Sequence, residues 1–206
     1  MFFYLFQGAA LALSATIMPG PFQAYLLSQA LRQGWRRTLP AALAPLATDG
    51  PIITLVLFVL TQVPPTLLEI LRTAGGLFLL YLSGSLALTL KKGDTAPHPG
   101  ESAARRTFFQ AVTMNFLNPN PYLWWSIIGG PIVLTGWKKS PAYGIVFLGG
   151  FYGVFILSLG VLIILFASAG RLDERVSKVL RIVAALALAG FGVYQVVSGL
   201  SSLLLV

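Results

Sequence analysis

One acidic residue, Asp49, stands inside a long apolar stretch of this 206-residue chain. It lies between Pro45 and Pro51 in the run LPAALAPLATDGPIITLVLFVL, and the next acid along the chain is Glu69. If this run crosses a bilayer, an ionised carboxylate at its depth costs roughly 2.5–3.5 kcal/mol of insertion free energy. A carboxyl group that is removed from water also favours its neutral, protonated form. The position therefore predicts a group that takes up and releases a proton or another cation.

Two other roles for Asp49 remain open at this level. The carboxylate could be the structural partner of an arginine on another helix, such as Arg72 or Arg181. It could also be a helix N-cap after a bend at Pro45, with Pro51 at an early helical position.

Two Pro-x-Pro motifs are the second chemical signal, at Pro19–Gly20–Pro21 and Pro119–Asn120–Pro121. Proline has no N–H and clashes with the carbonyl four residues earlier, so each motif should break a helix and free carbonyl groups. The residues expected to carry these carbonyls are Ala15, Ile17, Asn115 and Leu117. Beyond each break a new helix should begin near Pro21 or Pro121, with N–H groups that suit a carboxylate. Free carbonyls suit an ammonium group, so the pair of breaks predicts a site for an amino-acid zwitterion.

Four more polar side chains lie at comparable depth. Each is expected either to contact the solute or to form a hydrogen bond between helices; they are Gln23, Thr48, Asn115 and Asn118. A metal site would need several carboxylates or histidines, and the apolar segments offer one. No metal and no cofactor are therefore expected.

The composition shows which elements must position these residues. Charged residues make up 10% of the chain and apolar residues 56%, whereas about a quarter of a soluble domain is charged. The apolar segments are long enough to cross a bilayer and lack the alternation of a β-barrel. The expected fold is an all-α integral membrane protein in one domain, residues 1–206, with six transmembrane helices at 2–31, 39–61, 67–90, 107–135, 142–169 and 179–205.

The two halves of the chain resemble each other. Residues 1–90 and 107–206 each hold three segments, and a polar linker of residues 91–106 separates them. The Pro-x-Pro motifs lie in segments one and four, and both are followed by Gly-Trp, at Gly34–Trp35 and Gly136–Trp137. An odd number of crossings per half makes the repeats inverted. Inverted repeats with proline-broken first and fourth helices are typical of secondary transporters.

The basic residues predict the orientation of the chain. Eleven of the 14 lysines and arginines lie in or beside the first, third and fifth connections, and positively charged loops stay cytoplasmic. The linker 91–106 should then be cytoplasmic and both termini should lie outside. The first segment has no basic region before it, so we expect it to remain as a helix and not to be cleaved as a signal peptide.

The same residues resemble a known family. Pro19–Gly20–Pro21 and Asn118–Pro119, within FFQAVTMNFLNPNPYLWW, look like motifs of the lysine-exporter (LysE/RhtB-type) family, and Asp49–Gly50 resembles the acid often found in its second segment. The length, the six segments and the polar central loop also match. Family members usually carry Asn-Pro-Lys in the fourth segment, and Asn120 stands here in place of the lysine. The resemblance implies efflux of amino acids or related solutes, driven by a proton or ion gradient.

Several classes of function are excluded. The chain has no cysteine, so disulfides and iron–sulfur clusters are absent, and no ATP-binding motif is present. Its net charge of +8 is spread between apolar runs, which suits anionic lipids rather than nucleic acid. The predicted function is proton-coupled export of amino acids across the inner membrane, not enzymatic catalysis. The alternative is a passive channel or a membrane scaffold. The expected partners are a small solute, the bilayer and a coupling ion, and a homodimer is left open.

Overall fold

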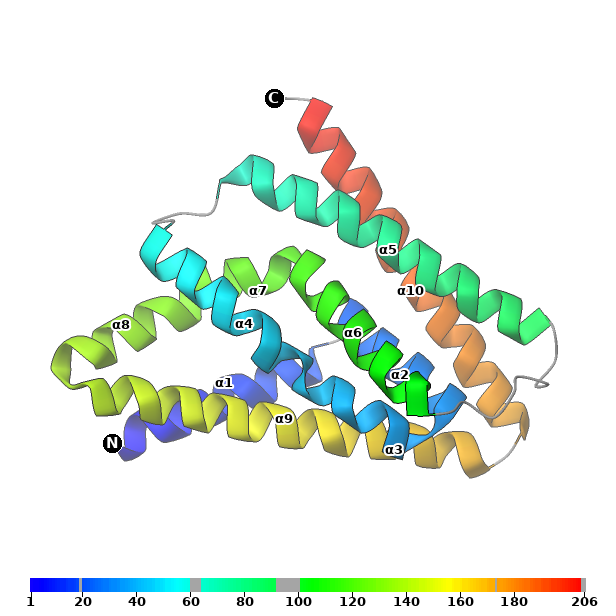
Figure 1. Cartoon of the computed structure of the whole chain (residues 1–206), viewed down its shortest axis with the longest axis horizontal. Coiled ribbons are helices and arrows are strands. Elements are labelled where there is room, and N and C mark those ends of the chain that lie inside the picture. The colour runs from blue at the N-terminus through cyan, green and yellow to red at the C-terminus, as the bar shows by residue number, and fades with distance from the viewer. Residues whose placement is uncertain (19, 60–63, 92–100, 173, 205–206) are drawn as a thin grey trace.

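The computed structural model describes residues 1–18, 20–59, 64–91, 101–172 and 174–204, and every element among them is helical. The first half contains α1 (Phe2–Ile17), α2 (Pro21–Gln33), α3 (Trp35–Thr38), η1 (Leu39–Leu43), α4 (Ala44–Thr54), η2 (Leu55–Val59) and α5 (Pro65–Lys91). The second half contains α6 (Glu101–Leu117), α7 (Pro119–Trp124), η3 (Trp125–Gly129), α8 (Gly130–Lys139), α9 (Pro141–Leu172) and α10 (Glu174–Leu204). Figure 1 shows their arrangement.

The first expected helix is broken at the first Pro-x-Pro motif. Met18 ends α1 with an extended backbone, Gly20 is also extended, and Pro21 is the first residue of α2. The residue before a proline is pushed out of helical geometry, which accounts for the extended conformation of Gly20. The axes of α1 and α2 differ by 67°. Pro19 lies outside the described residues.

The second expected helix is less regular than its apolar sequence suggested. Gly34 turns the chain with a φ of 80°, a value that glycine adopts without strain. After α3 a 3₁₀ segment contains Pro40, and α4 is followed by a π-helical turn, η2. Pro51 lies in the interior of α4. The prediction that Pro51 occupies an early helical position is therefore wrong, because the helix begins upstream at Ala44.

After the second break the new helix begins at Pro119, two residues before the predicted start near Pro121. Asn118 has an extended backbone and Pro119 is the first residue of α7, so Pro121 lies inside the new helix and does not begin it. A π-helical turn, η3, follows α7 and leads into α8. The linker is also shorter than residues 91–106, since α6 already begins at Glu101. Residues 92–100, with His98, lie outside the described residues.

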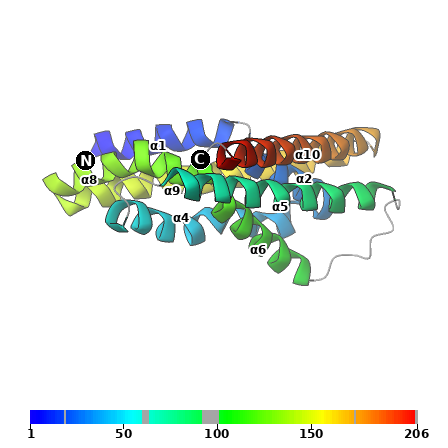
Figure 2. The same ribbon diagram turned by 90° about the horizontal axis from the view of Figure 1, so that it is seen from above.

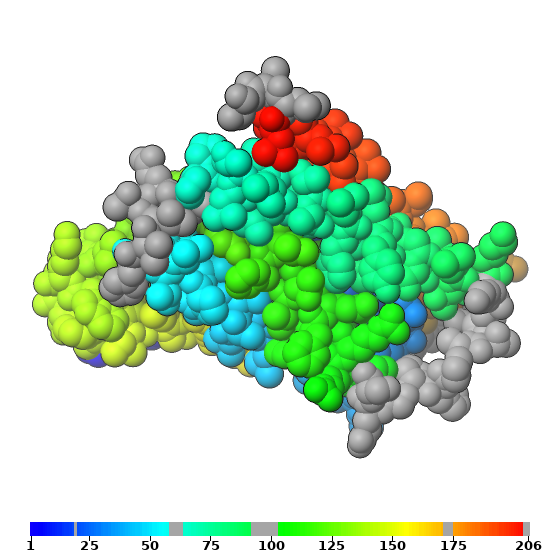
Figure 3. Space-filling model, turned by 45° about the horizontal axis from the view of Figure 1, so that its top comes forward, coloured from blue at the N-terminus to red at the C-terminus, as the bar shows by residue number. Residues whose placement is uncertain are grey.

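Long helices from opposite halves pack in pairs. α5 lies against α10 and α1 lies against α9, along two sides of a triangular outline (Figure 1). Seen from above, these helices form a flat layer from which α6 slants away (Figure 2). α6 lies over the boundary between α4 and α5 in the space-filling view (Figure 3). This position places the end of α6 beside the helix that carries Asp49.

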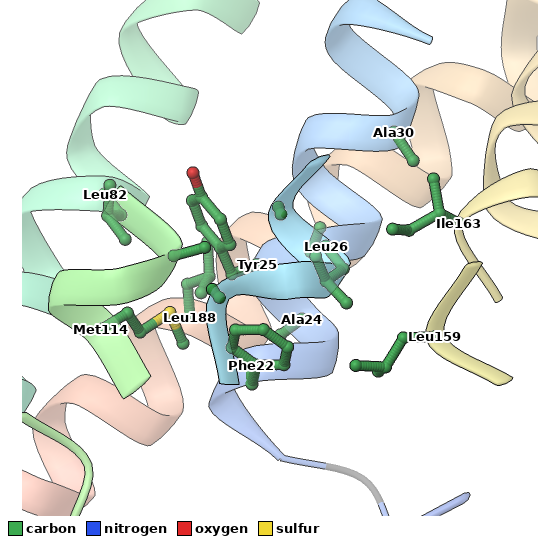
Figure 4. Close-up of a cluster of buried hydrophobic side chains, with 14 of the residues drawn as sticks. Phe22, Ala24, Tyr25, Leu26, Ala30, Leu82, Met114, Leu159, Ile163 and Leu188 are labelled. Carbon is green, nitrogen blue, oxygen red and sulfur yellow. The ribbon is translucent and has the colours of Figure 1, made fainter. Parts of the chain in front are cut away.

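A buried apolar cluster surrounds the start of α2. Figure 4 shows Phe22, Tyr25 and Leu26 of α2 among side chains from α5, α6, α9 and α10, including Met114 and Leu188. Phe22 follows the first break directly and Met114 precedes the second by a few residues. Both breaks therefore border the same core.

Four helical stretches are long and apolar enough to cross a membrane: Trp35–Leu57, Pro65–Lys91, Pro141–Gly170 and Arg175–Leu203. The bent pair α1 and α2 forms a fifth if it is one span. The expected sixth span, residues 107–135, is not among these because it is divided into α6, α7, η3 and α8. These helices identify the chain as an integral membrane protein. The arrangement of six spans in two inverted repeats stays a prediction.

Candidate functional site

Asp49 is held by hydrogen bonds from four elements. It lies in the interior of α4, and 5% of its surface is exposed. Its Oδ2 accepts from the Tyr152 hydroxyl at 3.0 Å and from the Trp125 indole N–H at 3.4 Å. Its Oδ1 accepts from the Asn115 amide at 3.2 Å and lies 3.3 Å from the hydroxyl oxygen of Thr48. The site therefore combines α4 with α6, η3 and α9.

All these donors are uncharged, and no basic side chain is bonded to Asp49 among the described residues. Arg72 forms a salt bridge with Glu69, at 3.0 Å. The hypothesis that Asp49 pairs with Arg72 or Arg181 therefore finds no support. The N-cap hypothesis is wrong, because α4 begins five residues earlier, at Ala44. The carboxylate is hydrogen-bonded but has no fixed counter-charge within the part of the chain that the structure describes.

Asn115 joins Thr48 to Asp49. Its Nδ2 lies 2.6 Å from the Thr48 hydroxyl oxygen as well as 3.2 Å from Asp49 Oδ1. The Thr48 hydroxyl is within reach of the Ala44 carbonyl, at 3.2 Å, in the preceding turn. Both Thr48 and Asn115 are buried. These two predicted site residues therefore do meet Asp49, although they lie in different halves of the chain.

Aromatic rings close one side of the carboxylate. Trp125 stacks on Tyr152 with a centroid distance of 6.2 Å and an interplanar angle of 24°. Phe151 packs edge-on to both rings. Neither Trp125 nor Tyr152 was predicted from the sequence as a partner of Asp49, because both lie far from Asp49 along the chain. A hydroxyl-bearing ring in the middle of an apolar segment was the available signal.

Gln23 bridges the first break and does not contact Asp49. Its amide donates to the carbonyls of Ala15, at 3.2 Å, and Thr16, at 3.4 Å. The Ala15 carbonyl is one of those that proline was expected to free. Gly20 has an extended backbone and no side chain to bind a ligand. In this conformation the bridge from Gln23 replaces part of the lost helical bonding.

The second break is also held by local hydrogen bonds. The Asn118 side chain caps α7 by accepting from the Asn120 N–H at 3.1 Å. That N–H would donate to Phe116 in a continuous helix, and the Phe116 carbonyl instead accepts from the Tyr122 hydroxyl at 3.0 Å. Asn120 is exposed, Asn118 is buried, and neither is bonded to Asp49. The two breaks and the aspartate are thus neighbouring but separate polar centres.

No group of three or more potential metal ligands occurs among the described residues. The family model described as LysE type translocator matches residues 13–199, which is nearly the whole chain. No curated protein and no solved structure gives a significant match.

Proposed function

We propose that this chain, a membrane transporter that belongs to the LysE type translocator family, exports amino acids or related small metabolites and couples export to a proton at Asp49. The observation that carries the proposal is a buried carboxylate with uncharged hydrogen-bond donors on both oxygens. We propose that the protein lies in the inner membrane with both termini on the outer side.

The chemistry follows from the lack of a charged partner for Asp49 among the residues that the structure describes. A buried charge is normally paired with an opposite one, because an unpaired ion in an apolar medium is strongly destabilised. Here a proton can neutralise the carboxylate, and the Tyr152 and Asn115 donors can stabilise it when the proton leaves. The hydrogen-bond donors therefore stabilise the ionised form of Asp49, and the apolar surroundings stabilise its protonated form. A carrier of protons needs both states.

The network also connects the two halves. Thr48 and Asp49 belong to the first half, while Asn115, Trp125 and Tyr152 belong to the second. A hydrogen bond to an ionised group is stronger than one to a neutral group. Protonation of Asp49 therefore weakens contacts between the halves, and loss of the proton restores them. Alternating access in transporters with repeated halves uses such relative movement.

The test is uphill transport by the Asp49→Asn variant in proteoliposomes. An amide does not release a proton near neutral pH, so we expect export against a gradient to be lost. Exchange of solute across the membrane should persist, because asparagine keeps the size of the side chain. Glu69→Gln is the matched control, since Glu69 is an acid outside the network.

A passive channel is the alternative, and the same measurement separates it. Through a channel, the solute would reach equal concentrations on both sides of the membrane in the parent protein and in Asp49→Asn alike. A pH gradient would not make it accumulate in either case. Undiminished accumulation by Asp49→Asn would show that the coupling group lies elsewhere.

A further inference from the structure

Two arginines lie close together where the end of α2 meets the start of α6. Arg32 lies in the last turn of α2 and Arg106 in the second turn of α6. Both are exposed, and their charges are close enough to repel each other. Neither guanidinium group forms a hydrogen bond or an ion pair within the part of the chain that the structure describes. The arginine pair, defined as Arg32 and Arg106, therefore has two positive charges and no acidic partner there.

Hydrogen bonds beside the arginine pair keep the two charges together. The Gln33 amide donates to the Thr107 hydroxyl, and these residues directly follow Arg32 and Arg106 in the chain. The Tyr25 hydroxyl donates to the Thr107 carbonyl at 2.9 Å, and both of these residues are buried. Because α2 and α6 are bonded to each other here, their ends cannot separate to relieve the repulsion.

Exposed aromatic side chains continue from the arginine pair along α6. Phe109 follows Arg106 by about one turn and is 53% exposed, and Phe116 lies two turns further on and is 43% exposed. Residues seven apart share a helix face. Trp35 begins α3, which packs against α6, and the Arg36 guanidinium lies over its ring at 5.2 Å. Tryptophan is enriched at the level of lipid headgroups, so this end of the molecule has the side chains of a membrane interface.

An oxyanion placed between two guanidinium groups cancels their repulsion and accepts hydrogen bonds from both. Arginine matches phosphate oxygens with two parallel donors. We propose that the arginine pair binds the phosphate of an anionic phospholipid headgroup, with an acyl chain along Phe109 and Phe116. The carboxylate of an amino acid fits less well, because the described acidic side chains, Asp49 and Glu69, are held in other contacts and leave no partner for its ammonium group.

The bound phosphate would hold together the two helices that border the breaks. α2 begins directly after the first break, and α6 ends directly before the second. An anionic lipid should therefore stabilise the packing of α2 against α6. This inference requires that the chain lies in a membrane, and it does not depend on the proton coupling proposed for Asp49.

The experiment measures the melting temperature of the full chain in a neutral detergent against added short-chain lipid. One series adds dioctanoyl phosphatidylglycerol, which has a net negative charge. The second adds dioctanoyl phosphatidylcholine, whose choline group neutralises the phosphate, and the third adds inorganic phosphate at the same concentrations. We expect a saturable rise with phosphatidylglycerol alone, because a ligand that binds only the folded state stabilises it.

Arg32→Gln and Arg106→Gln each remove one charge of the pair. The half-saturating concentration of phosphatidylglycerol should rise about fivefold in either variant, the effect of one basic residue at a membrane surface. Without lipid neither variant should melt below the parent, because the repulsion is relieved. Lys138→Gln is the matched control. It removes one exposed charge from α8, which lies far from the start of α6 (Figures 1 and 2), and it should keep the parent response.

The opposite results would each overturn the inference. A parent protein that does not respond to phosphatidylglycerol has no such site. Equal stabilisation by inorganic phosphate would indicate a site for soluble anions and not for a lipid. An equal loss of response in Lys138→Gln and in the arginine variants would indicate a general effect of net charge. An arginine variant that melts lower without lipid and keeps the full response would show that its arginine has only a structural role.

Discussion

At the scale of single residues, the hydroxyl of Tyr152 illustrates how the site depends on individual donors. It lies 3.0 Å from Asp49 Oδ2, closer than the other donor to that oxygen, Trp125 at 3.4 Å. Its ring also stacks on Trp125, so the side chain contributes packing as well as a hydrogen bond. Replacement by phenylalanine separates these contributions, because only the hydroxyl is removed.

For Tyr152→Phe we expect a loss of roughly 1.5–3 kcal/mol of stability, the usual range for a hydrogen bond to a charged group. Thermal unfolding in detergent should show a melting temperature lower by several degrees, and uphill transport should slow. Tyr194→Phe is the control, since Tyr194 is 66% exposed and its hydroxyl has no described bond. Equal melting temperatures for Tyr152→Phe and the parent would remove Tyr152 from the network.

At the scale of elements, glycines set the distance between paired helices. On α9, Gly150 faces α1, and a methyl group added there would lie 2.5 Å from the Leu5 carbonyl oxygen. Its neighbour Gly149 has no atom within 4 Å of the same position. Helices in membranes associate through small residues that allow close backbone approach. The two neighbouring glycines therefore have different roles.

Gly150→Ala should destabilise the protein by about 1–3 kcal/mol, because a backbone carbonyl cannot move aside as a flexible side chain can. Gly149→Ala should be neutral or stabilising by up to about 1 kcal/mol, because alanine is the better helix former. Denaturation curves of the two purified variants provide the comparison. If both variants unfold like the parent, α1 and α9 lie farther apart in the protein than the contact between Gly150 and the Leu5 carbonyl indicates.

At the scale of the whole molecule, the distribution of basic residues predicts the orientation in the membrane. Lys91 ends α5 before the connection between the halves and Arg106 lies in the second turn of α6 after it, whereas Lys138 lies at the end of α8. All three are exposed. The positive-inside rule predicts that the first two lie in the cytoplasm and that Lys138 lies outside.

Labelling of single cysteines tests this orientation, and the chain has no cysteine of its own to interfere. Lys91→Cys and Arg106→Cys should react with a membrane-impermeant maleimide only in inside-out vesicles. Lys138→Cys should react only in intact cells. The reverse pattern would invert the proposed topology.

Local chemistry explains what the sequence by itself determined. The membrane class and the positions of the apolar segments follow from the length of each run, which depends on no distant residue. The presence of both breaks follows from proline, because the missing N–H acts within one turn. Asp49 was identifiable because a carboxylate in an apolar run needs an explanation of its own. The start of α7 at Pro119 was missed, since either proline of the motif satisfies the local rule.

Only the tertiary structure decided which groups surround Asp49. Its partners Asn115, Trp125 and Tyr152 are 66, 76 and 103 residues away along the chain, and no local pattern brings such distant donors to one carboxylate. Packing also separated Asn115, whose amide donates to Asp49, from Asn118, whose side chain caps α7 at the second break. Side chains of the same type acquired different roles because hydrogen bonding in a membrane depends on which helices lie within about 3 Å of each polar atom.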